Sequence, residues 1–182
     1  MAITAAMVKE LREMTGAGMM DCKKALTETN GDMDAAVDVL KKSGAAKMEK
    51  KQSRIAAEGI ARVAVNGNVA VVAEVNSETD FVAKNETFQE FVQTVADTAL
   101  ASDLNGGANG EDIDALLATN GLNDLLVEKT ATIGEKLSVR RFAKVTGDIV
   151  TSYIHGGGRI GVIIAAEGAT DDAAKEALTN IA

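Results

Sequence analysis

The N-terminal part of the chain carries apolar residues at helical spacing, and capping and stop residues divide them into three segments. Thr4 is placed to cap a first helix, and Gly16 is placed to end it. A second helix is expected from about Met19 to Thr29. Asp32 is placed to cap a third helix that ends at Ser43-Gly44. The pattern therefore predicts a small bundle of three short helices.

Beyond residue 55 the pattern changes to the short apolar runs that are typical of strands. Asn66-Gly67-Asn68 joins two of these runs and is a strong hairpin signal. A strand pair followed by a helix occurs twice, so we expect two related halves. The expected elements are strands Ile60–Val65 and Val69–Val75, helix Thr87–Leu100, helical segments Glu111–Thr119 and Leu122–Ile133, strands Val139–Val145, Ile149–Ile154 and Gly161–Ala166, and a helix beginning near Asp171.

These patterns predict an α+β protein with four parts. The expected parts are a three-helix module (residues 1–44), a linker that is helical or flexible (45–54), the first half of a core (55–135) and its second, incomplete half (136–182). Residues 1–54 hold 10 Lys and Arg against 8 Asp and Glu, which is +2, and the remaining residues hold 9 against 19, which is −10. This asymmetry favours a separate N-terminal module with a partner surface of mixed sign, although a solvated surface alone produces the same asymmetry.

The composition of the 182 residues excludes several classes of protein. No run approaches the roughly 18 consecutive apolar residues of a membrane span, and the N-terminus lacks a signal-peptide pattern. A net charge of −8 argues against direct binding of nucleic acid. One cysteine and one histidine exclude a disulfide framework and an ordinary zinc site. We therefore expect a soluble cytoplasmic protein that holds no metal or other cofactor.

Three features resemble catalytic or phosphate-binding motifs, but each lacks a necessary part. His155-Gly156-Gly157-Gly158 is similar to the oxyanion loop of lipases, yet the chain has no Gly-x-Ser-x-Gly nucleophile, and a tight turn explains the glycines. Thr15-Gly16-Ala17-Gly18 matches neither the phosphate-loop nor the dinucleotide spacing. Cys22, which could pair with His155, has the surroundings of a small core residue. We expect no catalytic residue and no enzymatic activity.

Two apolar features have more than one interpretation. Phe81 follows a polar turn after the strand that ends at Val75. It either packs back onto the next helix as a hydrophobic staple or stays exposed as a wedge for a partner. Met19 and Met20 are neighbours on a helix and point in different directions, so both cannot be central core residues. We expect one of them to face inward and the other to lie on a docking surface.

Thr79-Asp80-Phe81-Val82 and the earlier segment Thr15–Leu26 together resemble the bacterial translation elongation factor Ts family. The likeness extends through Ile133-Gly134-Glu135, Arg140-Arg141 and His155–Val162. The three-helix module resembles the ubiquitin-associated type, which is a compact platform for docking partners. Family members normally continue past the second half of the core, whereas this chain stops within a helical pattern, so we expect a fragment that lacks the C-terminal parts.

The resemblance implies a guanine nucleotide exchange factor that promotes GDP release from the GTPase elongation factor Tu. Within Thr79–Val82, Asp80 and Phe81 would displace Mg²⁺ and disturb the phosphate site. The other implied partner contacts are Arg12, Met19, Met20 and Lys23 in the module and Ile133, Gly134 and His155 in the core. The alternative is an adaptor that binds ubiquitin-like or nascent chains through the two methionines, which leaves Thr79–Val82 unexplained. A hydrolase using Cys22 and His155 needs a geometry that the sequence does not provide.

Overall fold

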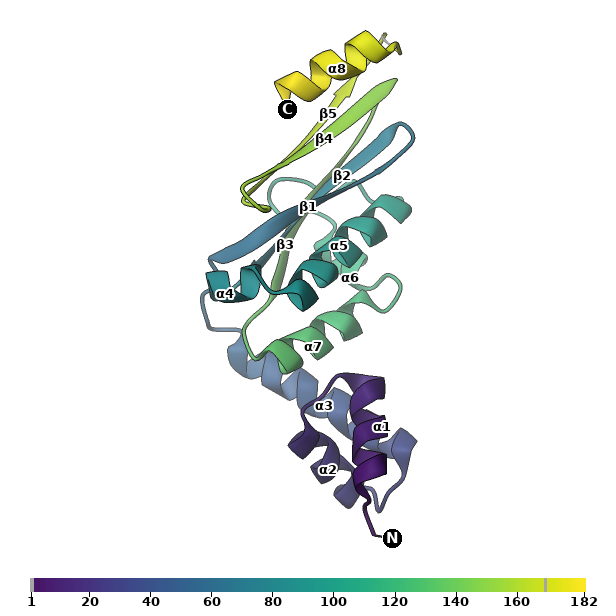
Figure 1. The fold of residues 1–182 in the computed structure, drawn as a ribbon, viewed down its shortest axis with the longest axis vertical. Coiled ribbons are helices and arrows are strands. Elements are labelled where there is room, and N and C mark those ends of the chain that lie inside the picture. The colour runs from purple at the N-terminus through teal and green to yellow at the C-terminus, as the bar shows by residue number, and fades with distance from the viewer. Residues whose placement is uncertain (1, 169) are drawn as a thin grey trace. The chain divides into compact units, whose positions relative to one another are not determined.

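The computed structural model describes residues 2–168 and 170–182, and its internal contacts divide the chain into two units (Figure 1). The helical unit comprises the residues up to Ile55 together with Asp124–Lys136. The sheet unit comprises Ala56–Asn123 and Leu137–Ala182. Helices and antiparallel strands together confirm the predicted α+β class.

The helical unit begins with helices α1 (Ala5–Thr15), α2 (Met19–Glu28) and α3 (Met33–Lys51). The predicted caps are confirmed, because the Thr4 hydroxyl accepts a hydrogen bond from the Met7 amide and the Asp32 carboxylate accepts one from the Ala35 amide. Gly16 ends α1 in the left-handed conformation, with φ of 65°. The buried side chains of the three helices form one cluster, which consists of Val8, Leu11, Cys22, Ala25, Leu26 and Ala36.

Helix α3 does not end at Ser43-Gly44, and this sequence-based expectation was wrong. The helix continues to Lys51, through most of the predicted linker, and Gly44 is buried within it. A Cβ atom at Gly44 would lie 3.1 Å from Cγ1 of Val127, which belongs to helix α7 (Leu122–Ile133). This glycine therefore allows two helices to approach closely and is not a stop signal.

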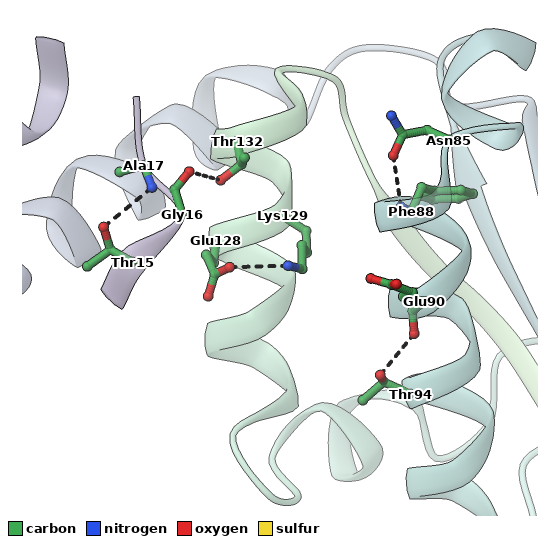
Figure 2. Close-up of polar contacts among 10 residues, drawn as sticks. All are labelled: Thr15, Gly16, Ala17, Asn85, Phe88, Glu90, Thr94, Glu128, Lys129 and Thr132. Atoms are coloured by element: carbon green, nitrogen blue, oxygen red, sulfur yellow. Dashed lines mark hydrogen bonds and ion pairs between the residues drawn. The ribbon is translucent and has the colours of Figure 1, made fainter. Parts of the chain in front are cut away.

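Most of α7 belongs to the helical unit, whereas the sequence pattern placed it in the first half of the core. Besides the Gly44 contact, the Thr132 hydroxyl lies 3.4 Å from the carbonyl oxygen of Gly16 (Figure 2). The Lys136 ammonium, just beyond α7, donates to the carbonyl oxygens of Gln52 and Arg54 at 2.6 and 2.9 Å. These contacts close the helical unit with a segment that is distant in sequence.

The sheet unit is built on a three-stranded antiparallel sheet in the order β1-β2-β3. The hairpin of β1 (Glu58–Asn66) and β2 (Val69–Ser77) turns at Gly67-Asn68, as predicted. Strand β3 (Ser138–Thr146) pairs with β2, so it joins this sheet and not the second strand pair. The single-turn helix α4 (Asp80–Ala83) follows β2, and α6 (Ile113–Leu117) contacts β3.

Helix α5 (Glu86–Ala101) contacts all three strands of the sheet. The Asn85 side chain caps it by accepting a hydrogen bond from the Phe88 amide, which is drawn in Figure 2. Its apolar face is buried as the 3.6-residue period predicts, through Phe88, Phe91, Val92 and Val95. This packing holds the sheet on which the segment Thr79–Val82 is mounted.

A second hairpin, of β4 (Ile149–His155) and β5 (Ile160–Ala166), lies on the opposite side of the first hairpin from α5 (Figure 1). Helix α8 (Asp172–Ile181) packs on β4, where the hydroxyls of Thr151 and Thr179 are 3.1 Å apart. No helix in the described part of the chain has the length and apolar content needed to cross a membrane.

Candidate functional site

The segment Thr79–Val82 leaves the end of β2 as a single helical turn with a fixed backbone. The Thr79 hydroxyl accepts a hydrogen bond from the Val82 amide at 3.4 Å, so Thr79 is the N-cap of α4. Ser77, which precedes the turn, and Ala83, its last residue, are both buried. Phe81 lies between them in the chain and is 80% exposed. The staple interpretation is therefore wrong, and the ring stands outward from a capped turn.

Asp80, next to Phe81, carries an ion pair that the sequence analysis did not identify. Its Oδ2 atom lies 2.7 Å from Nζ of Lys84, one helical turn later. The hydrogen bond and the charge of Lys84 hold the pKa of the Asp80 carboxyl below its ordinary value, and Arg159 adds a smaller effect of the same sign. Asp80 is consequently a carboxylate at neutral pH. The spacing of acid and base at i and i+4 was the sequence signal for this pair.

The turn between β4 and β5 supplies His155, which is exposed at the end of β4. The backbone of the turn is attached to the first sheet, because the Ala61 amide donates to the carbonyl oxygen of Gly158 at 2.7 Å. Gly158 has φ of 107°, and a Cβ there would lie 3.0 Å from Cβ of Ile60. Gly158 thus allows close packing against β1, whereas Gly156 and Gly157, with φ of 59° and 70°, supply the left-handed backbone of the tight turn that the sequence predicts. His155 and Thr79–Val82 belong to the same unit.

The remaining predicted contact residues lie in the helical unit. Met19 is 55% exposed and Met20 is 76% exposed, so the expectation that one of them faces inward was wrong. The core positions of α2 are taken instead by Cys22, Ala25 and Leu26. A shallow hollow on α2 is lined by Met20, Asp21, Lys23, Lys24, Thr27 and Glu28. With Arg12 also exposed, this surface combines adaptable thioethers with charges of both signs.

Ile133 and Gly134 mark the end of α7. Ile133 is half-buried and Gly134 is exposed. The Gly134 amide donates to the carbonyl oxygen of Thr130, and its φ of 85° is the left-handed conformation that ends many helices. The local geometry of Gly134 is fully explained as a helix stop, so any contact with a partner is an additional role.

The second hollow, in the sheet unit, has a volume of about 690 Å³ and is lined in part by Glu58, Glu74, Arg141 and Arg159. Two of these groups are paired, since Arg141 Nε lies 2.7 Å from Glu74 Oε2, and the neighbouring Arg140 adds a second contact, with its Nε 3.6 Å from Glu74 Oε1. The Glu74 carboxylate in this hollow is therefore already neutralised by arginine.

Cys22 does not have the surroundings of a hydrolase nucleophile. Cys22 is completely buried in the helical unit, where burial raises the pKa of its thiol, whereas His155 is exposed in the sheet unit. A nucleophilic cysteine needs the opposite environment. Among residues 2–168 and 170–182, no group of three or more His, Cys, Asp or Glu side chains is arranged to hold a metal ion.

The sequence of the chain matches one family of known proteins. Residues 78–182, which include Asp80, Phe81 and His155, match the family model described as Elongation factor TS. Elongation factor Ts of Jannaschia sp. (strain CCS1) is 54% identical over 191 aligned residues, and that of Ruegeria pomeroyi (strain ATCC 700808 / DSM 15171 / DSS-3) is 53% identical over 191. Both alignments cover 100% of this chain and 63% of the relative, so the chain spans less than two thirds of these proteins. The chain belongs to the elongation factor Ts family.

Proposed function

We propose that this chain is a guanine nucleotide exchange factor that promotes the release of GDP from elongation factor Tu by binding alone, without covalent catalysis. The main support is Phe81, a large apolar side chain that is 80% exposed on a capped turn. Removal of this ring from water is favourable, and a partner that covers the ring gains that free energy. The turn is already formed and capped in the free chain, which lowers the conformational entropy that is lost when a partner binds the ring.

Exchange requires that the factor binds the nucleotide-free GTPase more tightly than the GDP-bound form, and GDP then weakens the factor by the same ratio. Burying a phenylalanine contributes about 1.5–3 kcal/mol. This free energy corresponds to a factor of roughly 10–150 in an equilibrium constant. Phe81 therefore contributes to the coupling but does not supply all of it, and the remaining free energy is spread over other contacts.

Asp80 supplies the charge beside the ring. GTPases hold GDP through a phosphate-binding loop and a Mg²⁺ ion, so a carboxylate placed near that site competes with phosphate for the positive charges around it. The ionised state of Asp80, which Lys84 favours, suits this role. In this proposal Thr79 caps the turn, Asp80 and Phe81 enter near the Mg²⁺ site, and Val82 completes the segment.

The other predicted contacts extend the interface. The exposed surface of α2, with Met19, Met20 and Lys23, and the nearby Arg12 are assigned to the GTPase, as are Ile133, Gly134 and His155. Because Phe81 supplies only part of the coupling free energy, several further contacts with the GTPase are expected to supply the rest. Elongation factor Tu works in the cytoplasm, so the proposal implies a cytoplasmic location.

The test is the release of labelled GDP from purified elongation factor Tu, with and without this chain, at several Mg²⁺ concentrations. We expect faster release, with the largest acceleration when Mg²⁺ is abundant, because the chain then displaces the ion. An unchanged rate at saturating chain concentration would contradict the proposal. Binding of a ubiquitin-like protein in place of the GTPase would support the adaptor alternative, for which the exposed methionines are the supporting observation.

A further inference from the structure

The single histidine of the chain has a fixed neighbour. Tyr153 and His155 are two residues apart on β4, so their side chains lie on the same face of the hairpin. The Tyr153 hydroxyl oxygen is 2.9 Å from Nδ1 of His155, and the ring centroids are 5.9 Å apart. Tyr153 is 42% exposed, and His155 is also exposed, so the pair stands on the surface.

The hydrogen bond with Tyr153 restricts which ring nitrogen of His155 carries the hydrogen. In a neutral imidazole one ring nitrogen carries a hydrogen and donates, and the other accepts. The hydrogen bond that one nitrogen makes determines which tautomer is present. When the tyrosine hydroxyl donates to Nδ1, the hydrogen of the imidazole is on Nε2. The nitrogen that is then available to a partner is a donor.

We propose that Tyr153 is a positioning residue for His155: its hydroxyl holds the neutral ring as the Nε2–H tautomer and directs that N–H toward an acceptor, such as a carbonyl or carboxylate oxygen, on the partner. This inference rests on the proposed function, in which His155 contacts the GTPase. It adds the chemical class of the group that His155 recognises. A cationic group at the same place on the partner would be rejected.

Hydrogen bonds hold the backbone around the pair, so only the orientation of the His155 side chain remains to be set by Tyr153. His155 pairs with Ile160 across the hairpin, and its carbonyl oxygen accepts a hydrogen bond from the Gly158 amide at 3.2 Å. The carbonyl oxygen of Gly158 in turn accepts a hydrogen bond from the Ala61 amide of β1. With the main chain held in this way, the contact with Tyr153 selects the orientation and the tautomer of the ring.

The first experiment uses the free chain, so its result does not depend on any partner. Long-range ¹H–¹⁵N correlation spectra of the ring nitrogens, recorded at alkaline pH where an imidazole is neutral, distinguish the tautomers, and a single histidine makes the assignment unambiguous. We expect the Nε2–H form in the wild type and a mixture of tautomers in Tyr153→Phe. An Nδ1–H form in the wild type, or an unchanged spectrum in Tyr153→Phe, would overturn the inference.

The second experiment measures the chain concentration that gives half-maximal GDP release for Tyr153→Phe, His155→Ala and the double variant. If half of the rings lose the competent arrangement, the apparent affinity falls about twofold. We therefore expect a shift of about two- to threefold in Tyr153→Phe, and no further shift when Tyr153→Phe is added to His155→Ala. Equal shifts in both backgrounds would show that the tyrosine acts independently and would overturn the inference.

His155→Gln provides a control with a fixed donor, because the amide N–H₂ of glutamine takes the place of Nε2–H. We expect this variant to bind better than His155→Ala and to be insensitive to Tyr153→Phe. No acceleration of GDP release by the wild type would instead refute the proposed exchange function, while the spectra would still show whether Tyr153 holds the ring. A wild type that is active but unaffected by His155→Ala would overturn the inference alone.

Discussion

Nζ of Lys84 lies 2.7 Å from Oδ2 of Asp80, so the residue that precedes the exposed Phe81 is one half of an ion pair within a single helical turn. The side chains remain largely solvated, at 74% exposure for Lys84 and 45% for Asp80. Such a pair contributes little to stability and is weakened by salt. Its effect on ionisation and orientation is therefore more relevant than its effect on folding.

The first prediction concerns this ion pair. Lys84→Met should raise the pKa of the Asp80 carboxyl toward its ordinary value, because the hydrogen bond and charge that lower it are lost. A carboxyl whose pKa is lower in the folded state stabilises the fold above its unfolded pKa, and this contribution disappears as the pH falls through the folded pKa. The two proteins should therefore differ slightly in stability at pH 7 and converge in acid. Carboxyl ¹³C titration with melts from pH 2 to 7 measures both effects, and identical titration curves would refute the assignment.

The second prediction concerns the α2 surface. Met19→Ala and Met20→Ala should each change the free energy of unfolding by less than about 0.5 kcal/mol, as surface substitutions usually do, because both side chains are more than half exposed. Both should weaken binding to elongation factor Tu. Leu26→Ala, on the buried face of the same helix, is the matched control and should cost about 2–5 kcal/mol. Denaturant melts beside binding isotherms separate the effects, and a loss of stability in either methionine variant would place that side chain in the core.

The third prediction concerns the packing of α3 against α7. Gly44→Val should destabilise the helical unit by about 1–3 kcal/mol, the usual cost of overpacking, because even a Cβ at this position would lie 3.1 Å from the Val127 side chain. Ala45→Val, at an exposed neighbouring position, measures the cost of a β-branched side chain in this helix without overpacking, whereas the change from Gly to Val by itself improves helix propensity. Because propensity alone would make Ala45→Val the more destabilising of the two, a larger loss of unfolding free energy in Gly44→Val would come from the contact with Val127. If both behave alike, the close approach of the two helices is not a feature of the folded protein.

Local signals in the sequence predicted most of the elements. The caps at Thr4 and Asp32, the hairpin at Gly67-Asn68 and the buried face of α5 depend on neighbouring residues, so the sequence contains the information directly. The prediction that α3 ends at Gly44 was wrong because it also relied on neighbouring residues alone. Gly44 is needed for contact with Val127, which is distant in sequence, and a local pattern cannot distinguish this from a helix stop.

Exposure was the part of the candidate site that the sequence could not determine. Phe81 had two opposite interpretations because a staple and a wedge require the same residue at the same place, and only the tertiary structure shows that the ring is exposed. Met19 and Met20 were expected to divide between core and surface, yet the core of the bundle is filled by other residues of α2. The contact of Tyr153 with His155 had an available signal, the i and i+2 spacing on a strand, but its distance required coordinates.

The final prediction concerns Phe81 itself, the centre of the proposed mechanism. Phe81→Ala should keep the melting temperature of the wild type, because the ring is 80% exposed and takes little part in the core. It should slow GDP release by roughly 10-fold or more, which is the contribution expected from burying a phenyl ring in the complex. Val65→Ala removes another exposed apolar side chain, 46% exposed on the same unit, and should leave exchange unchanged.

The most direct measurement is the rate of release of labelled GDP from elongation factor Tu, with the wild-type chain, Phe81→Ala and Val65→Ala compared at equal concentrations. Circular dichroism melts of the same samples confirm that each protein is folded. We expect rapid release with the wild type and Val65→Ala and slow release with a fully folded Phe81→Ala. Wild-type exchange by folded Phe81→Ala would contradict the proposed role of the exposed ring.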